Sequence, residues 1–138
     1  MKTEFNFPIR VYYEDTDAGG VVYYANYLKF YERARSEWLN HLKVNQTELL
    51  ENNIAFVVTR AEVDYIKPAR LNDQLEVRSR IIKLGASTVV FEQVLFLKQN
   101  EKLEILNQAI IKVASLKLDT FSPCRIPAKV KEEFQRVS

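Results

Sequence analysis

The sequence predicts an α+β domain in which a curved, antiparallel five-stranded sheet wraps around one long central helix. Apolar side chains recur with helical spacing through residues 26–42. From residue 54 to residue 117 the pattern changes to β-branched runs with period-two alternation, separated by short turns. No repeat, low-complexity tract or linker interrupts the 138 residues, so we expect a single domain over residues 1–138.

The first strand is predicted over residues 5–13, which are rich in aromatic and β-branched side chains despite Pro8 near their start. The long helix follows at residues 26–42. Its apolar face consists of Tyr27, Phe30, Tyr31, Ala34, Trp38 and Leu42. A shorter helix is predicted from Asn45 or Thr47 through Glu51. The long helix offers the apolar surface on which a one-sided sheet can pack.

Four further strands are predicted at residues 55–66, 74–83, 88–99 and 103–117, and a last short helix at residues 128–134. Taken in chain order, the four strands form an antiparallel meander. The stretch Thr88–Leu97 is apolar on both alternations, and one helix covers only one face of a sheet. We therefore expect further burial in a homodimer or a homotetramer.

The composition excludes several classes of function. The chain has 20 Lys and Arg against 18 Asp and Glu, a net charge of +2, without the basic excess of a nucleic-acid or polybasic membrane binder. One histidine, His41, and one cysteine, Cys124, provide neither a Cys/His zinc site nor an intrachain disulfide. We expect no metal and no cofactor. No signal-peptide pattern and no bilayer-spanning apolar stretch is found, so a soluble cytoplasmic protein is expected.

The densest polar cluster is the segment from Glu14 to Gly20, EDTDAGG, directly before the long helix. N–H groups at a helix N-terminus stabilise negative charge, so a carboxylate facing them suits hydrolysis of an activated acyl group. The alternative is an acidic, solvated turn that caps the helix. A calcium-binding EF-hand loop is rejected, because its fifth and twelfth positions hold Gly19 and Asn26, which do not supply the required ligands.

The run from Val11 to Tyr27, VYYEDTDAGGVVYYANY, is followed at residues 30–35 by FYERAR. Together these segments resemble the signature of the 4-hydroxybenzoyl-CoA thioesterase family, a group of hotdog-fold acyl-CoA thioesterases. The similarity extends over nearly the whole chain and is greatest to the bacterial branch associated with the Tol–Pal system. The resemblance implies the hotdog fold and the hydrolysis of an acyl-CoA thioester to a free acid and coenzyme A.

The resemblance also implies roles for individual residues. Asp17 matches the catalytic carboxylate of the family, which acts as a nucleophile or as the general base that activates water. Gly19 and Gly20 match the substrate-binding turn, and Tyr24 matches the residue whose backbone N–H polarises the thioester oxygen. The Tol–Pal branch usually has histidine at the position of Tyr24. This departure concerns the substrate class and the pH profile, because a backbone donor survives the exchange.

Other residues complete the expected site. Ser87 and Thr88 are candidate contacts to the thioester or the pantetheine arm. Candidate cations for the coenzyme A phosphates are Arg60, Lys83, Arg125 and Lys129. We expect solvated or ion-paired side chains at Glu14 and Asp15, and surface or interface ion pairs at Arg33 and Arg35.

Alternative functions stay open at this point. The favoured function is a thioesterase that acts on acyl-CoA or on an acyl carrier protein thioester, with each site shared by two subunits. The rival is a non-catalytic module that binds an acyl thioester or an acyl carrier protein. A third and weaker interpretation is an interaction protein of the cell-envelope machinery.

Overall fold

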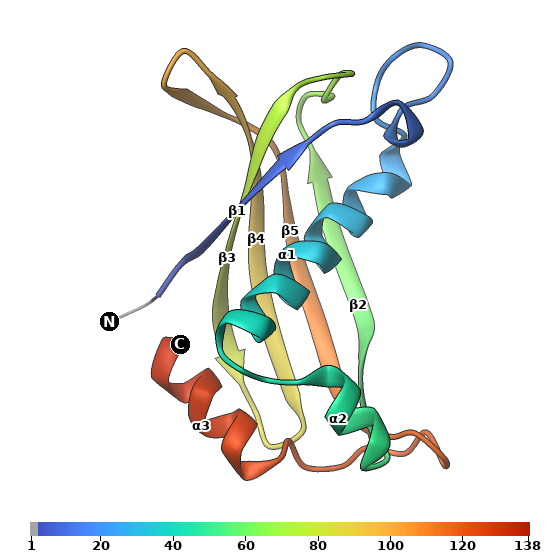
Figure 1. The fold of residues 1–138 in the computed structure, drawn as a ribbon, viewed down its shortest axis with the longest axis vertical. Helices are drawn as coiled ribbons and strands as arrows, with labels where there is room; N and C mark the ends of the chain where they lie inside the picture. Colours follow the sequence, from blue (N-terminus) through green and yellow to red (C-terminus); the bar gives the residue numbers. More distant parts are fainter. Residues whose placement is uncertain (1–2) are drawn as a thin grey trace.

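A computed structural model describes residues 3–138 and places one long helix across a five-stranded sheet (Figure 1). The strands are β1 (Phe5–Arg10), β2 (Ile54–Tyr65), β3 (Gln74–Leu84), β4 (Thr88–Gln99) and β5 (Lys102–Lys117). The helices are α1 (Tyr27–His41), α2 (Gln46–Glu51) and α3 (Ala128–Val137), and single 3₁₀ turns form at η1 (Tyr13–Asp15) and η2 (Tyr24–Asn26). The predicted fold class is confirmed.

The sheet has the order β1-β3-β4-β5-β2, and every neighbouring pair is antiparallel. The predicted four-stranded meander is therefore wrong in one respect, because β2 pairs with β5 and not with β3. The link between β2 and β3 is instead anchored on the start of α1. Ala69 in this link accepts a hydrogen bond from the Val22 N–H (2.9 Å) and donates one to the Tyr27 hydroxyl (2.9 Å).

Helix α1 buries the apolar face that its sequence predicts. All six predicted side chains are buried, and Phe30, Tyr31 and Ala34 are fully inaccessible. They lie against alternate residues of the central strands, including Val77 and Leu95, which are equally inaccessible. Truncation of a buried aromatic such as Phe30 to alanine typically costs about 3–5 kcal/mol. The core therefore lies between α1 and one face of the sheet.

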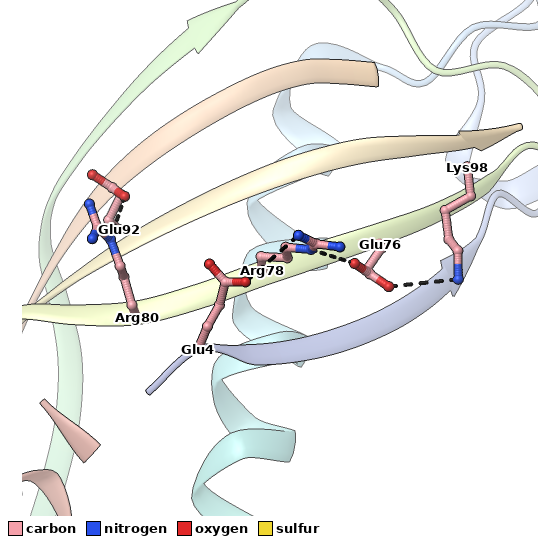
Figure 2. A network of polar contacts seen from close by, with 6 residues as sticks. All are labelled: Glu4, Glu76, Arg78, Arg80, Glu92 and Lys98. Carbon is pink, nitrogen blue, oxygen red and sulfur yellow. Dashed lines mark hydrogen bonds and ion pairs between the residues drawn. The ribbon is translucent and has the colours of Figure 1, made fainter. Parts of the chain in front are cut away.

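The other face of the sheet, which we call the outer face, explains the two-sided apolar pattern of β4. Val90, Val94 and Phe96 are half-buried there, whereas Val89 and Leu95 are buried under α1. Charged side chains lie across this outer face and pair with one another (Figure 2). Apolar residues on the outer face are thus partly covered by the chain itself.

The first strand is shorter than expected. It ends at Arg10, because the Val11 N–H donates to the Asp73 carbonyl oxygen (3.0 Å) and the chain then turns into η1. This turn brings residues 12–26 to the N-terminus of α1 (Figure 1). Over residues 3–138, none of the helices combines the length and the apolar character needed to cross a membrane.

Candidate functional site

Asp15 fixes the shape of the loop before α1, which comprises residues 12–26. Its carboxylate is buried and accepts hydrogen bonds from the Asn26 side-chain amide (3.0 Å) and from the Tyr12 N–H (2.9 Å). Its carbonyl oxygen accepts a third, from the Tyr23 N–H (3.2 Å). The expectation of a solvated or ion-paired Asp15 is therefore wrong, because neutral groups from both ends of the loop surround this carboxylate.

Asp17 lies on the outside of the tight turn that follows. Its carboxylate is exposed, and its Oδ1 accepts a hydrogen bond from the Gly19 N–H (2.8 Å). The Gly20 N–H closes the turn on the Asp17 carbonyl oxygen (3.0 Å). Gly20 has φ of 76°, the left-handed region that favours glycine. The glycine pair thus serves to present the Asp17 carboxylate at the surface.

The start of the helix supplies unpaired backbone donors. Tyr24 is the first residue of η2, which leads directly into α1, and the first bond within this turn runs from the Asn26 N–H to the Tyr23 carbonyl oxygen (2.8 Å). Within residues 3–138, the N–H groups of Tyr24 and Ala25 have no acceptor. Unpaired N–H groups of this kind, together with the α1 dipole, attract negative charge.

Tyr65 at the end of β2 holds this turn in place. Its hydroxyl donates to the Tyr24 carbonyl oxygen (3.0 Å), and its ring lies 5.7 Å from the Tyr27 ring and 6.4 Å from the Tyr24 ring, centroid to centroid. Burial raises the pKa of the Tyr65 phenol above its ordinary value. Sequence reasoning did not assign this role, because the partner of Tyr65 is distant along the chain.

The structure brings Asp17, Gly19, Gly20 and Tyr24 together at one end of the sheet. Ser87 and Thr88 lie at the opposite end, in and after the β3–β4 turn (Figure 1). The Ser87 carbonyl oxygen there accepts a hydrogen bond from the Ser115 N–H (2.8 Å). These two residues therefore do not reach Asp17 of the same chain, and their role stays a prediction.

The candidate phosphate-binding cations are also distant from Asp17 within one chain. Arg60 is paired in register with Lys112, and Lys83 with Val90, which places both on the outer face. Arg60 also forms an ion pair with Glu62. Arg125 precedes Ile126, whose N–H donates to the Ala86 carbonyl oxygen in the β3–β4 turn (2.9 Å). Their roles likewise stay predictions.

Comparison with known proteins identifies the family. Residues 19–104, more than half of the chain, match the family model described as the thioesterase superfamily. The chain belongs to the thioesterase superfamily. It is 42% identical over 134 residues to the acyl-CoA thioester hydrolase YbgC of Escherichia coli O6:H1, covering 97% of this chain and 98% of that one. It is 44% identical to the acyl-CoA thioesterase YbgC of Haemophilus influenzae, covering 96% of each chain.

Solved structures of thioesterases share the fold of this superfamily member. The DHNA-CoA thioesterase of Staphylococcus aureus superimposes with a TM-score of 0.90 at 25% identity, covering 98% of this chain and 91% of that one. A probable thioesterase of Bartonella henselae gives 0.80 at 34% identity, covering 91% and 100%. The family resemblance and the hotdog fold expected from the sequence are confirmed.

The chemistry available at this end of the molecule is that of a carboxylate beside backbone donors. Among residues 3–138, no group of three or more His, Cys, Asp or Glu side chains is placed to hold a metal ion. The groups present are an exposed carboxylate at Asp17 and unpaired N–H groups at Tyr24 and Ala25. Such a pair suits a reaction in which a carbonyl oxygen gains negative charge.

Proposed function

We propose that this thioesterase hydrolyses acyl-CoA thioesters, with Asp17 as the carboxylate catalyst and the Tyr24 N–H as the oxyanion donor. The observation that carries the proposal is the pairing, in one loop, of an exposed carboxylate with N–H groups that have no acceptor among residues 3–138. Relatives at 42% and 44% identity are named for the hydrolysis of acyl-CoA.

In the proposed reaction, the thioester carbonyl oxygen accepts a hydrogen bond from the Tyr24 N–H. The N-terminal end of α1 then stabilises the charge that develops on this oxygen. Asp17 either attacks the carbonyl carbon, giving an anhydride that water cleaves, or removes a proton from the water that attacks. In both routes the C–S bond breaks, coenzyme A leaves as the thiol, and the acyl group leaves as the acid.

The test is thiol release from a panel of short, medium, long and aromatic acyl-CoAs, with wild type and Asp17→Asn side by side. The asparagine Oδ1 still accepts from the Gly19 N–H, so the turn is preserved while the carboxylate is lost. We expect kcat to fall roughly 10²–10⁴-fold in the variant, the range of a lost acid–base group. Equal turnover in both proteins would remove Asp17 from the mechanism.

The same panel separates hydrolysis from the alternative function. A non-catalytic module would bind acyl-CoA, or an acyl carrier protein thioester, with the same affinity in both proteins and release no thiol. Calorimetric titration alongside the thiol assay measures this directly. Tight binding without turnover on any member of the panel would favour the module over the enzyme.

The phenol of Tyr24 is a separate question from its backbone N–H. Because the proposed donor is the N–H, Tyr24→His should keep kcat within about tenfold of wild type. An imidazole titrates near pH 6.5, so the pH–rate profile of the variant should gain an inflection in that region. A complete loss of turnover in Tyr24→His would instead assign the essential role to the phenol.

We also propose that two chains pair through β2. This strand is an edge of the sheet and has twelve residues, whereas the other edge, β1, has six and contains Pro8, which cannot donate to a neighbour. Tyr65 at the end of β2 is 49% exposed, which leaves apolar surface for a partner. Analytical ultracentrifugation should give twice the mass of the chain, and a monomer would contradict the pairing.

Antiparallel pairing of two β2 strands places opposite ends of the two chains side by side. The end with Ser87 and Thr88 then approaches the Asp17 end of the partner, as a shared site requires. The test is a mixture of Asp17→Asn with the double variant Ser87→Ala/Thr88→Ala. Hybrid dimers then hold one site with neither change, so turnover should exceed that of either variant alone. No gain on mixing would place each site within one chain.

A further inference from the structure

A groove runs between α1 and β2, beginning one helical turn beyond Tyr24. Its upper part is a cavity of about 330 Å³ lined by Leu28, Val58, Ala61 and their neighbours. A deeper cavity of about 120 Å³ adjoins it and has aromatic walls, Phe56, Phe91 and Phe134. Glu32, Arg35 and Val58 line both cavities. The two hollows are therefore parts of one mainly apolar groove with two charged residues at the point where they join.

Arg35 reaches into this groove from α1 and is held by an amide. Its Nη1 donates to the Gln93 Oε1 (2.9 Å). Gln93 is fully buried, and its Nε2 donates to the Ser79 Oγ (2.9 Å) and to the Tyr31 carbonyl oxygen (3.0 Å). Because both amide protons of Gln93 are engaged, its oxygen is fixed toward Arg35.

Arg35 is half-buried and has no carboxylate partner among the described residues. No ion pair among the described residues includes it, and burial lowers the pKa of its guanidinium to about 10. The surface ion pair expected at Arg35 is therefore not formed within this one chain. Glu32, which lines the groove with it, is exposed and accepts from the Ser36 hydroxyl (2.9 Å). A guanidinium has five N–H donors, so Arg35 keeps donors that its single bond to Gln93 does not use.

An unpaired cation in an apolar groove is unfavourable for folding alone. Arg33, two residues earlier on the same helix, is exposed to water. Arg78 and Arg80 on the outer face each bind a carboxylate, with Nε–Oε distances of 2.6 Å to Glu76 and 2.7 Å to Glu92. Arg35 alone among these arginines lies in the groove and contacts only an amide, which indicates a role in binding.

We propose that Arg35 binds an oxygen atom on the acyl chain of the substrate, so that the groove selects oxygen-bearing acyl groups over plain hydrocarbon chains of equal length. This inference rests on the thioesterase function proposed above. A hydroxyl group fits best, because it accepts from Arg35 and also donates to Glu32, whereas a carboxylate would be repelled by Glu32.

The length of the groove favours a flexible chain. Arg35 lies about three turns beyond Tyr24, which is about 16 Å along the helix axis at 1.5 Å per residue. Side chains on a helix lean toward its N-terminus, so the guanidinium lies nearer to Tyr24 than its Cα does. An oxygen that reaches Arg35 is therefore several bonds from a thioester bound at Tyr24. A medium-length aliphatic chain with an oxygen near its end satisfies this spacing.

The test compares octanoyl-CoA, 8-hydroxyoctanoyl-CoA and suberoyl-CoA, whose chains end in methyl, hydroxyl and carboxylate groups. We expect wild type to favour the hydroxyl chain over octanoyl by roughly tenfold in kcat/KM, the value of one good hydrogen bond. Arg35→Met should remove this preference, bringing the kcat/KM values for 8-hydroxyoctanoyl-CoA and octanoyl-CoA to within about twofold of each other. Arg33→Met, the matched control on the exposed face of α1, should change neither value.

The three chains also separate binding from structural damage. Arg35→Met leaves the Gln93 Oε1 without its donor, and mere damage would lower turnover on all three substrates equally. Such a uniform loss, or a wild-type preference for octanoyl, would overturn the proposal. A preference for suberoyl that disappears in Arg35→Met would support oxygen binding by Arg35 with a carboxylate as the ligand.

A second measurement tests the role of Arg35 in binding independently of the proposed thioester hydrolysis. The thioethers S-octyl-CoA and S-(8-hydroxyoctyl)-CoA cannot be hydrolysed, so calorimetric titration of them reports binding alone. Tighter binding of the hydroxyl analogue, lost in Arg35→Met, would support Arg35 even if no thioester were cleaved. Equal affinity of wild type for both thioethers, or no binding of either, would overturn the proposed role of Arg35.

Discussion

The loop before α1 and the outer face of the sheet both gather carboxylates, but they stabilise them in opposite ways. On the outer face several carboxylates meet cations, as Glu76 does between Arg78 and Lys98 (Figure 2). In the loop, Asp15 is buried and bonded only to neutral groups. Solvated ion pairs tolerate exchange and add little stability. A buried carboxylate with fixed donors permits one geometry, so the loop depends on very few residues.

Asp15→Ala should have the largest effect on stability, because it leaves the Tyr12 N–H and the Asn26 amide without their acceptor. We expect the free energy of unfolding in urea to fall by about 2–4 kcal/mol. Asp17→Asn is the matched control and should stay within about 0.5 kcal/mol of wild type, because Asp17 is exposed. Equal losses in the two variants would show that the two carboxylates of the loop have the same structural role.

Variants of the two glycines test two different properties of the loop: its stability and the position of the Asp17 carboxylate. Gly20→Ala forces a Cβ into a backbone with φ of 76° and should cost about 1–2 kcal/mol in urea denaturation. At Gly19 a Cβ would lie 3.3 Å from the Asp17 Oδ1. Gly19→Ala should therefore lower kcat more than it lowers stability. Unchanged turnover in Gly19→Ala would mean that the position of this oxygen is unimportant.

A third titratable group, the buried phenol of Tyr31 on α1, should make the stability of the protein depend on pH in the alkaline range. Burial raises the pKa of Tyr31, whose hydroxyl donates to Asn107, above its ordinary value. The unfolded chain loses this proton near pH 10 while the folded chain keeps it, so stability is fully present below pH 10 and falls as the pH rises. We expect a loss of under about 1 kcal/mol at pH 10.5. If the free energy of unfolding of Tyr31→Phe falls as steeply with pH as that of wild type, the loss of stability comes from other groups.

The smallest effect is expected for the outer face. A double-mutant cycle on Arg80 and Glu92, joined at 2.7 Å, should give a weak coupling energy that decreases as salt is added. The hydrogen bond to Glu92 raises the pKa of Arg80, so this guanidinium stays charged at neutral pH. The same cycle applied to Asp15 and Asn26 should give a larger coupling energy. Equal coupling energies for the two pairs would mean that the loop and the outer face stabilise their carboxylates to the same extent.

Local patterns were sufficient for most elements of the fold. The 3.6-residue spacing of Phe30, Tyr31 and Ala34 predicted the buried face of α1, because side chains at this spacing share one side of a helix. The position of β2 beside β5 was not predictable in this way. Its pairing joins residues that are distant along the chain, such as Tyr65 and Asn107, and no local spacing reveals such a contact.

The sequence predicted which loop forms the candidate site, but it did not predict the structural role of each residue in that loop. The sequence places three carboxylates close together, at Glu14, Asp15 and Asp17. It does not tell which of these side chains is buried. The partner that buries Asp15 is Asn26, at the other end of the loop. Arg35 was identified as part of the helix signature, but its contact with Gln93 joins α1 to β4 and needs the folded sheet.

The docking of the β2–β3 link on the start of α1 has a consequence for biosynthesis. Asp17 belongs to the first part of the chain to be made, yet its loop is braced by Ala69 through Val22 and by Tyr65 through Tyr24. Tyr65 is in turn placed by pairing with Asn107 on β5. Contacts over such long separations form slowly and late. The ribosome therefore synthesises Asp17 early, but the contacts that hold its loop in place form only after β5 has emerged.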